Sequence, residues 1–147
     1  MPLIPAKPSL LRRIAIGKAI GFLVGLAELL ALPLFVVEPS WLMRWGILFW
    51  YVTVGALIGL FGVIDRQPML GLRLAWWFRG PFLGAWMNFV LTLFAYDAFA
   101  EIMRYTFGAG GALSSPFWFV LEGAVVGLLI DYLATRHGGE GDAVAGR

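Results

Sequence analysis

Long apolar runs alternate with short polar or proline-containing segments along this 147-residue chain. Four runs are long enough to be transmembrane helices, at residues 14–37, 45–64, 82–100 and 117–134. An α-helix rises 1.5 Å per residue, so about 20 apolar residues cross a hydrocarbon core of about 30 Å. The pattern predicts an all-α fold, a four-helix integral membrane bundle that forms one domain over 1–147. Residues 1–13 and 136–147 are predicted to be flexible tails.

A fifth, shorter helix is predicted between the second and third spans. In the segment from Met69 to Arg79, one helical face carries apolar side chains and Arg73 lies at its edge. Such a segment favours a helix that lies in the membrane interface. The following Gly80-Pro81 is expected to end this helix and to begin the third span.

Glycines recur every three or four positions in three of the four spans. This spacing places them on one helical face, where another helix can approach closely. The predicted helix-packing positions are Gly21, Gly25, Gly55, Gly59, Gly123 and Gly127. We expect the first two spans to pack as a tight hairpin, and we find no convincing repeat between the two halves of the chain.

Composition and charge agree with a membrane location. The chain is 61% apolar and only 14% charged, which leaves too few polar side chains to cover a water-soluble domain. Nine cations fall on the side that holds both tails and the second turn, and only Arg44 and Arg104 fall on the other. The positive-inside rule then predicts cytoplasmic N- and C-termini, in what we expect to be a bacterial inner membrane. The basic pI indicates a lipid partner rather than nucleic acid.

Candidate chemistry comes from carboxyl groups inside the predicted spans. Counting residues from the span ends places Glu28, Asp97 and Glu122 near one depth. Carboxylates that share a site disfavour each other's ionisation and can bind a cation or exchange protons. This grouping suggests a proton- or cation-coupled transporter or channel. Four helices enclose little volume, so we expect a homo-oligomer.

The alternative is that each acid makes its own local contact. In either case we expect Asp131 to pair with an inner arginine such as Arg66 or Arg136; in the alternative, Asp97 pairs with Arg104 or Arg44. Under this interpretation the protein is a non-catalytic accessory or scaffold subunit of a larger membrane complex. We also expect Asn88 and Thr92, which lie one turn apart, to bond to a neighbouring helix.

Other functional classes lack the residues they require. The chain has no cysteine, and His137 is its only histidine. Thiolate metal sites, bis-histidine haem ligation and an imidazole-based triad therefore cannot form within this chain alone. The sequence predicts no cofactor and no enzyme activity.

Overall fold

The computed structural model describes residues 8–35, 39–64, 66, 71 and 73–145. Within these residues it is helical, with no extended strand and one isolated antiparallel bridge between Arg66 and Arg73. The elements in chain order are α1 (Leu10–Ala31), η1 (Leu32–Leu34), α2 (Trp41–Phe61), α3 (Trp76–Phe94), α4 (Tyr96–Phe107), η2 (Ala112–Ser114), α5 (Trp118–Gly138) and α6 (Asp142–Ala145).

Three helical segments are long and apolar enough to cross a membrane. They are α1 with η1, then α2, and then α5. The consecutive helices α3 and α4 meet the same criterion only together, and they are bent by 98° relative to each other. These features confirm an all-α chain with the properties of an integral membrane protein.

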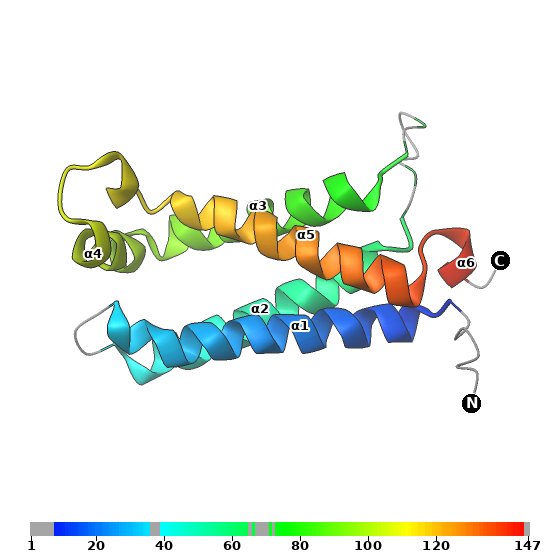
Figure 1. Cartoon of the computed structure of the whole chain (residues 1–147), viewed down its shortest axis with the longest axis horizontal. Helices are drawn as coiled ribbons and strands as arrows, with labels where there is room; N and C mark the ends of the chain where they lie inside the picture. Colours follow the sequence, from blue (N-terminus) through cyan, green and yellow to red (C-terminus); the bar gives the residue numbers. More distant parts are fainter. Residues whose placement is uncertain (1–7, 36–38, 65, 67–70, 72, 146–147) are drawn as a thin grey trace.

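The bundle consists of two helical hairpins in two layers (Figure 1). Helix α1 packs most extensively against α2, and α3 packs most extensively against α5. The described chain begins and ends at one end of the bundle, here called the terminal end, and α4 lies at the opposite end, here called the far end. A core cluster that includes Tyr51, Val54, Ile58 and Ile130 joins the two hairpins.

Glycines bring the backbones of α1 and α2 together, as the sequence predicts. A Cβ atom added at Gly25 would lie 2.8 Å from the Cα atom of Leu48, and one at Gly59 would lie 2.7 Å from the carbonyl oxygen of Arg13. Side chains at these positions would therefore push the helices apart. The same holds for Gly21 and Gly55, which lie against the backbone of the opposite helix.

The second hairpin is also held by close backbone packing at glycines. Gly123 and Gly127 of α5 lie against α3, where Gly80 and Gly84 provide the matching surface. The glycines of α3 were not among the predicted packing positions. The two hairpins also share a short motif, Gly-Ala-x-x-Gly-Leu, at residues 55–60 of α2 and 123–128 of α5. The two halves are therefore more alike than the sequence analysis indicated.

The predicted helix over Met69–Arg79 is wrong where the structure describes it. Residues 73–75 are not helical, and Trp76–Arg79 form the first turn of α3; Met69 and Leu70 lie outside the described residues. Pro81 does not end a helix but lies inside α3. Arg79 and Gly80 are buried at this point because both pack toward α5, and these tertiary contacts hold the helical conformation through the proline.

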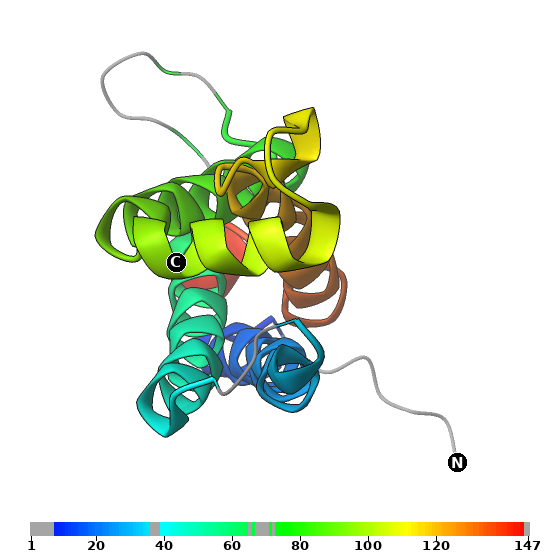
Figure 2. The same ribbon diagram turned by 90° about the vertical axis from the view of Figure 1, so that its left-hand side faces the viewer.

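An amphipathic helix lies instead at the far end of the bundle. Helix α4 runs across the ends of the other helices (Figure 2). It buries Phe99, Ile102 and Met103 toward the bundle and exposes its charged side chains. Phe99 and Ile102 form a second apolar cluster with Leu32 of η1, so α4 covers the far end of the first hairpin as well.

Candidate functional site

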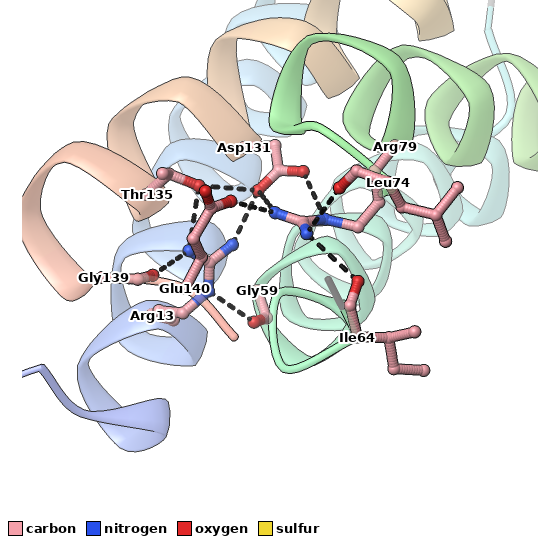
Figure 3. A network of polar contacts seen from close by, with 9 residues as sticks. All are labelled: Arg13, Gly59, Ile64, Leu74, Arg79, Asp131, Thr135, Gly139 and Glu140. Carbon is pink, nitrogen blue, oxygen red and sulfur yellow. Dashed lines mark hydrogen bonds and ion pairs between the residues drawn. The ribbon is translucent and has the colours of Figure 1, made fainter. Parts of the chain in front are cut away.

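A buried charge cluster joins the two hairpins at the terminal end (Figure 3). It contains Arg13 from α1, Arg79 from α3 and Asp131 from α5, which are 0%, 3% and 0% exposed. Asp131 accepts a hydrogen bond from Nη2 of Arg13 at 2.6 Å. Its two carboxylate oxygens also accept from Nε and Nη2 of Arg79, at 2.8 and 3.0 Å. One carboxylate thus bridges two guanidinium groups.

The remaining donors of both arginines are directed at nearby oxygen atoms. Arg13 donates to the carbonyl oxygens of Gly59 and Gly139 and to the hydroxyl of Thr135. Arg79 donates to three further acceptors: the carbonyl oxygens of Ile64 and Leu74, each at 3.2 Å, and the carboxylate of Glu140 at 3.3 Å. All five N–H groups of the Arg79 guanidinium and four of the five of Arg13 have protein acceptors, so this cluster serves as a structural clamp rather than a ligand site.

Asp131 pairs with arginines of the predicted inner side, but not with the two that were named as examples. Arg66 and Arg136 are both exposed, and Arg136 donates instead to the hydroxyl of Tyr132 at 2.8 Å. The sequence predicts Arg13 in a flexible tail and Arg79 at the end of an interfacial helix, whereas α1 begins at Leu10 and both arginines are buried in long helices. The signal for Arg13 is its register: it lies four residues before Gly17 and therefore continues the buried glycine face of α1.

A second polar layer lies deeper in the bundle. The hydroxyl of Tyr51 on α2 donates to Oε1 of Glu122 on α5 at 2.5 Å. The indole N–H of Trp50 donates to Oδ1 of Asn88 on α3 at 3.0 Å. Nδ2 of Asn88 in turn donates to the Tyr51 hydroxyl at 3.2 Å and to the carbonyl oxygen of Phe119 at 2.9 Å. These side chains, called here the Tyr51–Glu122 layer, link the first hairpin to the second.

The expectation that Asn88 bonds to a neighbouring helix is confirmed, since it contacts both α2 and α5. For Thr92 the expectation is wrong: its hydroxyl donates to the carbonyl oxygen of Asn88 on its own helix, at 2.7 Å. Tyr51 and Trp50 were not predicted as polar partners. Tyr51 lies four residues before Gly55, so its register on the glycine face is the signal that indicates an inward direction.

Glu28 and Glu122 line one small cavity beside this layer. Its wall also includes Trp50, Tyr51 and Phe99. The cavity leaves about 20 Å³ for the centre of a water molecule, which is room for about one water. Both carboxyl side chains are only partly exposed, and they come from different hairpins. Two of the three predicted acids therefore meet at one site.

The third acid, Asp97, is not part of this site. Helix α3 ends at Phe94, and the bend places Asp97 in the first turn of α4, where it is exposed. The depth estimate assumed a straight third span through residue 100. Among the described residues no ion pair joins Asp97 to Arg104 or Arg44; these arginines donate to the carbonyl oxygens of Ala100 and Leu29 respectively.

The site therefore consists of two layers with different chemistry. The charge cluster closes the terminal end, and the Tyr51–Glu122 layer with Glu28 lies toward the far end beneath Phe99 of α4. Among the described residues no group of three or more His, Cys, Asp or Glu side chains could hold a metal ion. Comparison with protein-family models, curated proteins and solved structures gives no match.

Proposed function

We propose that this protein is a small membrane transporter or channel that binds and releases a proton at Glu28 and Glu122. The observation that carries the proposal is the placement of two carboxyl side chains from different hairpins on one water-sized cavity. Ionisable side chains within membrane-spanning helices are costly and frequently mark proton or ion pathways. A cavity with room for about one water suits a proton better than a larger solute.

The hydrogen bonds of Glu122 couple a proton to the arrangement of the hairpins. Ionised Glu122 accepts from the Tyr51 hydroxyl, which itself accepts from Asn88. When Glu122 gains a proton, its carboxyl group acquires a donor and the strongest acceptor for Tyr51 is lost. Tyr51 and Glu122 belong to different hairpins, so each proton gained or lost changes a contact between them.

The side from which a proton reaches the cavity follows from the difference between the two ends of the bundle. At the terminal end the charge cluster is buried, which disfavours passage of a cation past two guanidinium groups. At the far end the cavity is covered by Phe99 of the amphipathic helix α4. We therefore assign proton entry to the far end. With cytoplasmic termini in a bacterial inner membrane, that end faces the periplasm.

Proton flux into liposomes tests this function. Purified protein is reconstituted with a pH-sensitive dye inside the vesicles, and a proton gradient is applied. Glu122→Gln and Glu28→Gln should abolish protein-dependent flux, because an amide keeps the shape but cannot exchange the proton. Glu101→Gln is the matched control, since Glu101 is exposed on α4. Flux that is unchanged in Glu122→Gln would refute the assigned site.

An accessory or scaffold role is the second candidate, and one observation favours it. Gly46 lies on an exposed part of α2, and a Cβ atom added there would meet nothing within 4 Å. A small residue at an open helical surface allows close approach by another helix, either from a second copy or from a different membrane protein. Absence of flux from the unaltered protein, together with co-purification of another membrane protein that Gly46→Leu displaces, would establish this role instead.

A further inference from the structure

Helix α4 and the loop that follows it form an open surface depression of about 570 Å³ at the far end, here called the polar pocket. One stripe of α4 forms the first wall, with Tyr96, Asp97 and Arg104. The second wall is the loop from Gly110 to Pro116. This pocket is separate from the cavity at Glu28 and Glu122.

An open apolar groove of about 600 Å³, here called the apolar pocket, continues from it along α5. Its wall includes Phe117, Trp118, Leu121 and Ala124, and it shares Ala112 and Ser115 with the polar pocket. The ring of Phe117 lies between the two, 6.0 Å from the ring of Tyr96. The loop is held to α5 by the indole N–H of Trp118, which donates to the carbonyl oxygen of Ala112 at 3.0 Å. A polar compartment and an apolar one thus adjoin where an amphipathic helix meets the lipid-facing surface.

The charges in the polar pocket select the ligand. Asp97 and Arg104 are both exposed, lie two turns apart on α4 and have opposite signs. Glu101, which lies between them along the helix, does not line the pocket. Anionic lipids are recognised by clusters of several Lys or Arg side chains, which this surface lacks among its described residues. One acid and one arginine complement a ligand with one positive and one negative group.

We propose that this surface binds a phospholipid whose headgroup carries a phosphate and a primary ammonium. Arg104 pairs with the phosphate, because a guanidinium group matches phosphate geometry. Asp97 accepts hydrogen bonds from the ammonium, which a quaternary ammonium could not donate. An acyl chain lies in the apolar pocket against Phe117 and Leu121. The amphipathic orientation of α4 places its charged face at headgroup level, where this lipid is available.

Lipid retention in native mass spectrometry tests the assignment. The full-length protein is reconstituted with equal amounts of ethanolamine, choline and glycerol phospholipids that have identical acyl chains. We expect preferential retention of the ethanolamine lipid. Asp97→Asn should reduce the protein's preference for the ethanolamine lipid over the choline lipid about two- to fivefold, as expected for one exposed charge pair. Arg104→Gln should weaken retention of all three lipids by a similar factor, and Glu101→Gln should change nothing.

Two results would overturn the proposal. The first is that Asp97 does not select the ethanolamine lipid: either the unaltered protein retains the three lipids equally, or the preference for the ethanolamine lipid survives Asp97→Asn. The second is binding of soluble phosphoethanolamine in detergent with the same affinity as the lipid, since the apolar pocket would then contribute nothing. Ala124→Trp tests the contribution of the apolar pocket directly. Because the indole fills this pocket, the variant should retain less lipid but bind soluble phosphoethanolamine as the unaltered protein does. None of these outcomes depends on proton flux.

Discussion

Replacement of Asp131 by asparagine should strongly destabilise the bundle. Asp131 is fully buried and, among the residues that the structure describes, is the only carboxylate that contacts both Arg13 and Arg79. It accepts three hydrogen bonds from their guanidinium groups and one from the hydroxyl of Thr135, at distances from 2.6 to 3.2 Å. Asparagine keeps the shape of the side chain but removes the charge and points an N–H₂ donor at guanidinium donors.

The size of the stability loss in Asp131→Asn follows from the charges that remain buried. Arg13 and Arg79 would keep two positive charges, and within the described part of the chain Glu140 would be their one remaining counter-ion. Its side chain is 40% exposed and 3.3 Å from Arg79. Removal of one partner from a buried ion pair costs about 3–5 kcal/mol. Removal of a partly exposed partner costs at most about 1 kcal/mol. We therefore expect Asp131→Asn to cost several times more than Glu140→Gln.

Thermal and denaturant unfolding in detergent, followed by tryptophan fluorescence, provide the measurement. Asp142→Asn is the matched control, because Asp142 is exposed in α6 and its substitution should change stability by no more than about 0.5 kcal/mol. A double variant, Arg13→Met with Asp131→Asn, should be less destabilised than the sum of its single variants, because one uncompensated charge is also removed. Stability of Asp131→Asn within about 1 kcal/mol of the unaltered protein would refute the clamp.

Two further predictions concern packing and topology. Gly59→Leu and Gly84→Leu should each lower the stability of the protein by about 1–3 kcal/mol, because the added side chain overpacks a hairpin. Gly111→Leu, at an open loop position, should leave the thermal midpoint unchanged. Equal midpoints for all three variants would contradict the close backbone contacts. Reporter domains fused after residue 147 and inserted at Gly110 should report opposite sides of the membrane, with residue 147 cytoplasmic; the same signal from both would refute the orientation used for proton entry.

The sequence predicted part of the site because register and composition are local properties. Glu28 follows the glycine face of α1 by three residues, so helical periodicity alone predicts that it lies at a helix–helix contact and not toward lipid. Glu122 lies beside Gly123, at the edge of the face that packs against α3. By contrast, Tyr51 and Asn88 became partners of Glu122 only through the approach of two hairpins that are far apart in the chain.

By itself, the sequence determined the helical class, the membrane-compatible length of the apolar segments and the glycine contacts of the first hairpin. Each of these depends on hydrophobicity and spacing within one helix. Only the tertiary structure decided that Asp131 lies between Arg13 and Arg79 and that α3 runs through Pro81. It also decided that the chain bends after Phe94 and carries Asp97 away from the other acids. Asp131 meets Arg13 and Arg79 because α1, α3 and α5 come together at the terminal end, and after the bend Phe99 and Ile102 of α4 pack against Leu32 of the first hairpin. Both outcomes depend on contacts between segments that the linear pattern does not contain.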